Sequence, residues 1–291
     1  MMKTRINLAI LSVATALVAS CATVGSPPDG LDAAPFYTKH VSASGIPILS
    51  SARVPDEALM AARDMTRSMF AHRPKLAQWL AANDYRIAIM AQDEALLDLP
   101  ENRHWEKPAP DDPRLTRCER KHYDARIGAL TDRQYWDARA RAIGGKRMAD
   151  GAEDVLGLRT SRYYGETIFV HELAHLVLDA VQATDRALYA QVEAAYANAL
   201  ENDLWLDEYT TTTIQEYWAE GTQFWFNSNR LQAFDGRRIL NHTDLQRYDP
   251  QLYAVLGAAY GNGHVLESDP FHMHPARVPP GPIPENTAEV C

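Results

Sequence analysis

Two histidines and a glutamate within five residues are the part of this chain best suited to chemistry. The stretch His171-Glu172-Leu173-Ala174-His175 places its two imidazoles four positions apart. On a helix, positions i and i+4 share a face, so both rings can reach one metal ion. Glu172 lies beside them and can act as the general base for a water held at that metal. The spacing therefore predicts a hydrolytic metal site.

The surroundings of this stretch favour a buried helix. Apolar residues flank it on both sides, and Gly165 precedes it. We therefore predict a helix over 165–181 with the histidines on one face. The alternative is a core helix whose histidines hydrogen-bond only to backbone groups.

A catalytic zinc site needs a third protein ligand from another element. The best segment is 213–228, whose aromatic residues recur at helical spacing and whose Glu216 and Glu220 share a face. Two acids on so apolar a helix are costly to bury without a cation or a hydrogen-bond partner. We predict Glu216 as a ligand of one Zn²⁺ ion, and Glu220 as acceptor of the free N–H of a ligand histidine. The alternatives are a Thr213–Glu216 capping box and a solvated or salt-bridged Glu220.

With these residues the chain resembles the gluzincin metallopeptidases, and within them the anthrax lethal-factor type. Its pattern is matched by Glu216-Tyr217-Trp218-Ala219-Glu220, which starts 45 positions after His171, and by Tyr209, seven positions before Glu216. The resemblance implies His171, His175 and Glu216 as zinc ligands, Glu172 as the base, and Tyr209 as the group that hydrogen-bonds the oxyanion. The rest of the toxin architecture is absent, so its substrate class is not carried over.

Three further stretches resemble secreted or lipid-anchored proteins that share this zinc core. They are Asp98–Arg103, Arg141–Gly145 and Tyr248–Tyr253. Together with the few strands and many helices, the resemblance implies a helix-dominated α+β fold. We expect a zincin-like metallopeptidase domain with a small sheet beside the active-site helix.

The N-terminus reads as a lipoprotein signal peptide over residues 1–20. Lys3 and Arg5 precede an apolar run that is too short to span a membrane. Val18-Ala19-Ser20-Cys21 resembles the bacterial lipobox, which predicts a lipid on Cys21 and an outer-membrane location facing the periplasm. An ordinary cleaved signal peptide is the alternative.

Cysteine usage and charge limit the partners. The periplasm permits disulfides, so Cys118 and Cys291 either form a bridge or remain unpaired thiols. The formal net charge of −9 argues against a nucleic-acid partner and against electrostatic docking to anionic lipid. Any membrane contact is then expected through the lipid anchor, and the expected partner is a peptide or protein substrate.

The remaining sequence predicts a single domain. Residues 21–45 read as the lipidated cysteine and a flexible tether, 46–263 as the catalytic domain, and 264–291 as a Pro-rich tail packed on it. We expect helices over 53–80 with a break at Pro74, over 183–200 and over 248–260. The clearest strand prediction is 85–90.

Several other polar residues are weaker candidates. Asp179 can support the site but is better explained as a helix-end acid. His272 and His274 are spaced for a metal but fall in the tail, and Arg159 and Arg162 are expected to be solvated charges.

Two classes of function fit these patterns. The first is a zinc hydrolase, most simply a metallopeptidase; hydrolysis of a non-peptide amide would use the same residues. The second is a non-catalytic, zinc-containing envelope lipoprotein that acts as a binding or assembly module. A structural zinc site usually has four protein ligands, and the three predicted here favour catalysis.

Overall fold

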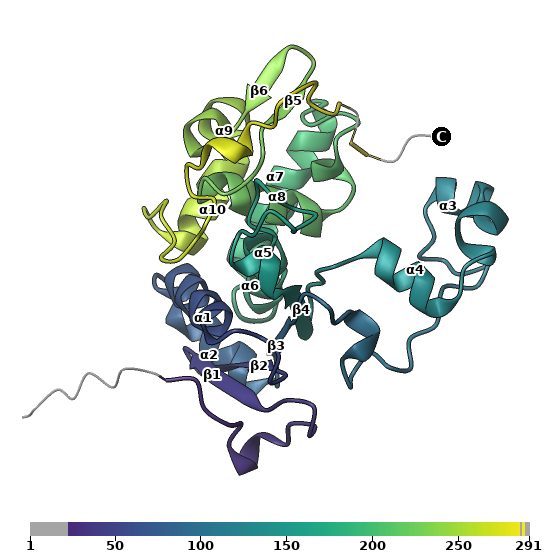
Figure 1. Cartoon of the computed structure of the whole chain (residues 1–291). Coiled ribbons are helices and arrows are strands. Elements are labelled where there is room, and N and C mark those ends of the chain that lie inside the picture. Colours follow the sequence, from purple (N-terminus) through teal and green to yellow (C-terminus); the bar gives the residue numbers. More distant parts are fainter. Residues whose placement is uncertain (1–22, 286, 289–291) are drawn as a thin grey trace, which may run out of the picture.

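A helix-dominated α+β fold with one small mixed sheet surrounds a central helix (Figure 1), as expected from the sequence. The computed structural model describes residues 23–285, 287 and 288. The strands are β1 (Lys39–Ala43), β2 (Ile46–Ser50), β3 (Arg86–Met90), β4 (Arg147–Gly151), β5 (Gln232–Phe234) and β6 (Arg237–Ile239). The α-helices are α1 (Asp56–Phe70), α2 (Pro74–Ala82), α3 (Arg117–Lys121), α4 (Asp132–Arg139), α5 (Ala152–Val155), α6 (Ile168–Thr184), α7 (Arg186–Glu201), α8 (Ile214–Trp225), α9 (His242–Tyr248) and α10 (Pro250–Tyr260).

The main sheet has the order β1-β2-β3-β4, with β1 and β2 antiparallel and the other pairs parallel. Ser44 and Gly45 both have positive φ, of 52° and 94°, which suits the tight turn of the β1–β2 hairpin. Alternate residues face opposite sides: Ile48 and Ile87 belong to the main core, whereas Leu49 and Ala88 belong to a smaller cluster on the other face. The sheet is thus buried on both sides.

Strand β1 corrects one prediction, because residues 21–45 were expected to form a flexible tether. Gly25 pairs with His40, and β1 occupies residues 39–43 of this range. The alternating Val41 and Ala43 are buried against the core, a short pattern that the nearby Gly and Pro residues obscured. Any tether must therefore be shorter than predicted.

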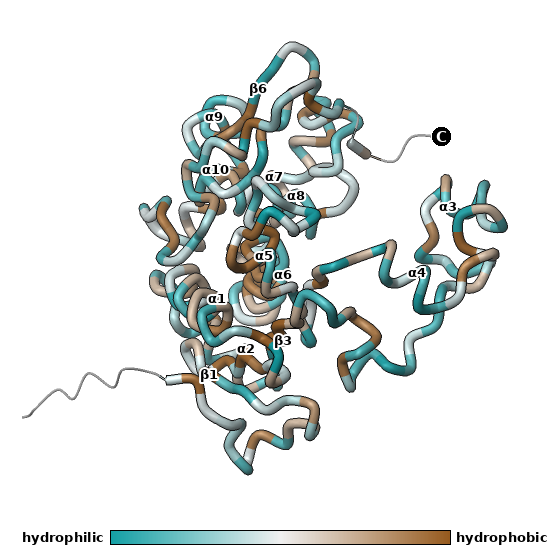
Figure 2. Tube along the Cα trace, viewed as in Figure 1, coloured by the Kyte–Doolittle hydropathy of each residue, from teal (hydrophilic) through white to brown (hydrophobic). Residues whose placement is uncertain are grey.

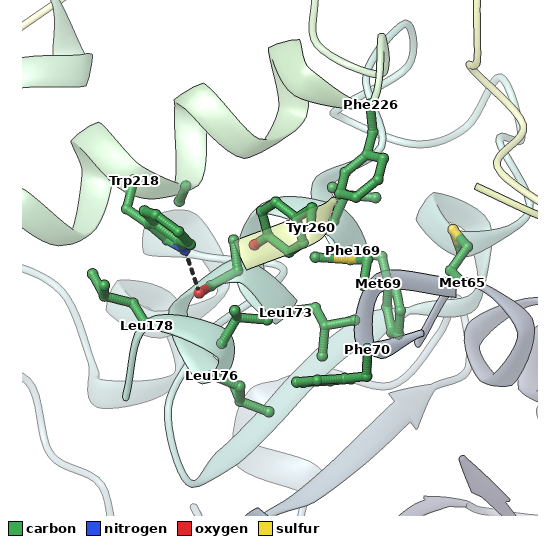
Figure 3. Packing of buried hydrophobic residues seen from close by; sticks show 14 of the residues in the cluster. Met65, Met69, Phe70, Phe169, Leu173, Leu176, Leu178, Trp218, Phe226 and Tyr260 are labelled. Atoms are coloured by element: carbon green, nitrogen blue, oxygen red, sulfur yellow. Dashed lines mark hydrogen bonds between the residues drawn. The ribbon is translucent and has the colours of Figure 1, made fainter. Parts of the chain in front are cut away.

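Helix α6 lies at the centre of the fold and is buried on almost every side. It packs against α2, α7 and α8 and touches β4, and hydrophobic residues gather around α5, α6 and β3 (Figure 2). Phe169 and Leu173 meet Phe70 and Met69 of α1 (Figure 3). A helix that is apolar around most of its circumference is stable only in such an interior position.

Helix α8 is fixed to α6 by a buried hydrogen bond. The indole Nε1 of Trp218 donates to the carbonyl oxygen of Ala174 at 3.1 Å, drawn as a dashed line in Figure 3. Ala174 immediately precedes His175 in the sequence. The bond therefore helps to set the position of the glutamate-bearing helix relative to the histidine-bearing one.

Residues 105–140, here called the side module, stand apart from the rest of the fold (Figure 1). The module contains α3, a π-helical turn at Asp124–Gly128, and α4. Its small apolar cluster of Leu115, Ile127 and Tyr135 is separate from the main core. The segment 99–113 has no helix or strand.

Several predictions fall on residues outside the described part of the chain. Both the signal peptide and the lipidation site Cys21 lie there, and so does Cys291, the proposed partner of the buried Cys118. Lipid anchoring and the envelope location therefore remain predictions. Cys118 is disulfide-bonded, which excludes a free thiol there, and its pairing with Cys291 stays a prediction because the partner lies outside the described residues. Among the described residues, no helix is long and apolar enough to cross a membrane.

Candidate metal centre

The two histidines and Glu172 project from the middle of α6 toward one cleft. The ring centroids of His171 and His175 lie 4.9 Å apart, as expected for residues one helical turn apart. The His171 side chain is buried, and the Glu172 carboxylate lies 4.0 Å from Nε2 of His175. The predicted helix is present, although it runs from Ile168 to Thr184 rather than over 165–181.

Helix α8 brings Glu216 to the same point. Its Oε2 lies 2.9 Å from Nε2 of His171 and 3.9 Å from Nε2 of His175. Thr213 caps the helix by accepting the backbone N–H of Glu216 at 3.1 Å, but the Glu216 side chain turns to the histidines. Only half of the capping box is thus formed, and the carboxylate is available to a ligand.

His171, His175 and Glu216 form a group that can hold a metal ion. Each offers one ligand atom, and these atoms lie within 4.8 Å of one another. A tetrahedral zinc ion with bonds of about 2.0–2.1 Å keeps its ligand atoms roughly 3.3 Å apart. The two distances from Glu216 lie on either side of that value, so small side-chain adjustments would complete the coordination. Two nitrogens and one carboxylate oxygen are also donors that suit zinc.

Polar side chains behind His171 fix which of its nitrogens faces the metal group. Its Nδ1 lies 3.2 Å from Oε1 of Gln223 and 3.4 Å from Oε1 of Glu220. Both neighbours are acceptors there, because Gln223 donates its own amide to the carbonyl of Thr167 at 3.1 Å. Nδ1 therefore carries a hydrogen, which leaves Nε2, the nitrogen that faces Glu216, as the one available to a metal ion.

Glu220 lies where a hydrogen-bond acceptor behind the ligand was predicted. It is 8% exposed, and its Oε2 accepts the amides of Asn229 at 2.8 Å and Gln232 at 2.7 Å. It is not solvated, and its partners among the described residues are these two amides and His171 rather than a lysine or arginine. The amides hold Glu220 in place, so that its second oxygen remains directed at His171.

The charges of the centre favour a cation between the ligands. Burial alone would lower the pKa of His171, but hydrogen bonds to Glu216 and Glu220 outweigh it and raise this pKa well above its usual value. Burial and the charge of His171 lower the pKa of His175 to about 4. Without metal, His171 thus holds a proton beside the Glu216 carboxylate. A metal ion would displace this proton and supply the positive charge instead.

A cleft of about 530 Å³ opens in front of these residues. Its lining includes His171, Glu172, Tyr209 and Glu220 near the metal group, and Leu115, Tyr135 and Trp136 from the side module. Part of the lining comes from the segment 140–143, whose Ile143 pairs with Ala149 of β4 through two hydrogen bonds of 2.9 Å. The metal group is therefore reachable by a ligand of peptide size.

Gly144 closes the space between this segment and α6. A Cβ atom at this position would lie 2.7 Å from Cδ2 of His175, so no larger residue fits without displacing the ring. The backbone N–H of Gly144 also hydrogen-bonds Glu172. Burial is the larger influence and raises the pKa of Glu172 to about 7. The segment around Gly144 therefore orients both the base and a ligand.

Tyr209 reaches the cleft from the short 3₁₀ turn Tyr209–Thr211. Burial, the Glu216 charge and a hydrogen bond to Glu216 raise the pKa of its phenol, so the hydroxyl keeps its proton. Two tail residues hold this turn: Thr287 Oγ1 accepts the backbone N–H of Tyr209 at 2.8 Å, and the Ala288 N–H donates to the Asp207 carbonyl at 2.9 Å.

The weaker candidates do not join the metal group. Asp179 accepts a hydrogen bond from Tyr85 at 3.2 Å, more than one turn before α6 ends, so it is neither a helix-end acid nor part of the site. His272 faces the Phe226 carbonyl, and His274 accepts the N–H of Ala276. Arg162 bonds to the Asp137 carbonyl, and Arg159 lies 5.5 Å from the ring of Tyr164.

No protein-family model and no curated protein matches the chain. Among solved structures, the chain is similar to the Pro-Pro endopeptidase from Paenibacillus alvei, with 15% sequence identity and a TM-score of 0.41. That match covers 72% of this chain and 96% of the endopeptidase chain. Function is therefore inferred from the geometry of the site.

Proposed function

We propose that the protein is a zinc-dependent hydrolase, and specifically a metallopeptidase of the gluzincin type. The observation that carries the proposal is the convergence of His171, His175 and Glu216, because His171 also lines a cleft together with the non-ligand carboxylate of Glu172. Among the described residues the group has three ligands, which leaves room for water or substrate at a fourth position. That arrangement is typical of catalytic zinc sites rather than structural ones.

His171, His175 and Glu216 would hold the zinc ion, and Glu220 and Gln223 would keep His171 in the correct tautomer. When bound, zinc supplies Lewis acidity that lowers the pKa of a water to about 7 and polarises a carbonyl group. Glu172 accepts the proton of the attacking water on its carboxylate and returns it to the leaving amine. The Gly144 N–H keeps this carboxylate directed at the cleft.

The shape of the cleft favours a peptide over a small amide. Its lining includes the extended segment 140–143, where a backbone edge of this kind can align a substrate chain by main-chain hydrogen bonds. The side module adds the aromatic side chains of Tyr135 and Trp136 to the lining. A substrate several residues long would contact both the segment 140–143 and these aromatic side chains.

The proposal is tested by incubating the purified domain with a peptide library, with and without a chelator. We expect cleavage products that disappear when zinc is removed and return when about one equivalent is restored, with mass spectrometry of the products as the readout. Cleavage that survives complete zinc removal contradicts the proposal. Turnover of amide-containing non-peptides alone would replace the peptidase assignment with a different amidohydrolase.

Tyr209 is expected to act on the oxyanion rather than on the metal. The change Tyr209→Phe removes a hydroxyl that retains its proton near Glu216, so we expect kcat to fall about 10- to 1,000-fold. Zinc content and KM should change little, because the phenol is not a ligand. Steady-state kinetics and metal analysis on the same preparation check this, and Tyr253→Phe, in α10 and outside the cleft lining, is the control. An unchanged kcat would exclude the role.

A further inference from the structure

Glu166 is an acid in the cleft that the proposed reaction does not use. It lies just before α6, and its side chain is 15% exposed. The carboxyl lines the same cleft as His171 and Glu172. A largely buried acid that faces a ligand cavity needs an explanation, because burying a carboxylate without a good partner is costly.

Glu166 has one weak partner among the described residues. Oε1 lies 3.4 Å from Nη1 of Arg230, which is long for a charged hydrogen bond. Arg230 is held elsewhere, since its Nη2 donates to the Tyr164 carbonyl at 2.9 Å. Burial raises the pKa of Glu166 to about 7 in spite of Arg230, and the Glu220 charge adds to the rise. Arg230 is not part of the cleft lining, so a ligand would meet the carboxyl and not the guanidinium.

The neighbours of Glu166 in the cleft are apolar or aromatic. Ile168 lies on the same face of α6 as His171 and Glu172, because the three occupy positions i, i+3 and i+4. Tyr163, which precedes Glu166 in the sequence, also lines the cleft. A substrate whose carbonyl lies at the metal ligands, and whose next side chain follows this face, would pass Ile168 and Tyr163 and end at Glu166.

We propose that Tyr163, Ile168 and Glu166 form a subsite for the lysine or arginine side chain of a peptide substrate, next to the scissile bond. The inference rests on the proposed peptidase function. The aliphatic stem of such a side chain packs on Ile168 and the Tyr163 ring, and its cationic head meets the Glu166 carboxylate. The cleft lining carries five acids against two arginines, so an acidic side chain is disfavoured there; the acids are Glu106, Glu119, Glu166, Glu172 and Glu220, and the arginines are Arg114 and Arg139.

The test uses matched peptides that carry lysine, norleucine or glutamate at the positions on either side of the cleaved bond. For the wild type we expect kcat/KM to be at least about 10-fold higher for lysine than for norleucine at one of these positions, and lowest for glutamate. Glu166→Gln should lower kcat/KM for the lysine peptide about 10- to 100-fold and leave the norleucine peptide nearly unchanged. Glu106→Gln, an acid in the same cleft contributed by the side module, should leave the ratio unchanged.

The failure of this inference can be told apart from failure of the proposed function. If neutral peptides are cleaved as well as lysine peptides, or Glu166→Gln keeps the ratio, the subsite is excluded and the peptidase remains. If no peptide is cleaved, the peptidase assignment fails, and calorimetric binding of the lysine and norleucine peptides to the zinc-loaded protein decides the subsite alone. Equal affinities there would overturn it, whereas a lysine preference lost in Glu166→Gln would support it.

Discussion

Glu172→Gln is expected to abolish peptide hydrolysis while zinc remains bound. The carboxylate lies 4.0 Å from Nε2 of His175 and is not one of the three converging ligands, so the amide should not disturb the metal. An amide cannot accept the proton of the attacking water, and the loss of a positioned general base lowers kcat by about 10²- to 10⁴-fold or more. Peptide turnover and zinc content should be measured on the same folded preparation.

The control for this variant is Glu106→Gln, which neutralises another acid of the cleft. It should retain both zinc and activity. If Glu172→Gln turned over peptides at the wild-type rate, Glu172 would not be the base. If it lost zinc, the glutamate would be a ligand, and the assignment of the three donors would be wrong.

Unlike Glu172→Gln, a variant that lacks a zinc ligand is expected to lose the metal ion itself. His171→Ala and Glu216→Ala each leave two donors, and Glu220, the carboxylate behind His171, is held by Asn229 and Gln232. Zinc content should fall from about one per chain to well below it after dialysis against a zinc buffer. Added zinc stabilises a protein that binds it by RT ln(1 + [Zn]/Kd), about 2.7 kcal/mol at 100 times Kd, and so should raise the Tm of the wild type. This rise in Tm should be absent in the two ligand variants.

His274→Ala is the control for the ligand variants, because the tail histidines were the other candidate metal pair. His274 caps a short turn by accepting the N–H of Ala276, away from the three converging ligands. Its zinc content and zinc-dependent Tm should match those of the wild type. Full zinc binding by His171→Ala, or zinc loss in His274→Ala, would show that zinc binds at a different site from the one assigned here.

Local patterns in the sequence were sufficient to predict the elements that hold the ligands. The four-residue spacings of His171 and His175, and of Glu216 and Glu220, each indicate one helix face, and the structure places both pairs on helices. Pro74 separates two helices, as predicted, because it occupies the first turn of α2. Gln223 was missed, although it follows Glu216 and Glu220 on the same helix face and this spacing would have revealed it.

Contacts between distant segments had no local signal. The pairing of Ile143 with Ala149 depends on how the chain returns to the sheet edge after the side module. Likewise, the close approach of Gly144 to His175 is a packing constraint that no spacing encodes. Glu166 resembles any charged residue ahead of a helix, and only its burial in the cleft distinguishes it.

The contacts of Thr287 and Ala288 with the Tyr209 turn have a practical consequence for anyone who handles this protein. An affinity tag fused downstream of these residues would emerge beside the cleft and compete with the hydrogen bonds that hold the tyrosine backbone. Recombinant material tagged on that side risks giving a falsely low rate in an assay. A cleavable tag placed ahead of Thr23, at the opposite end of the described chain, avoids that artefact.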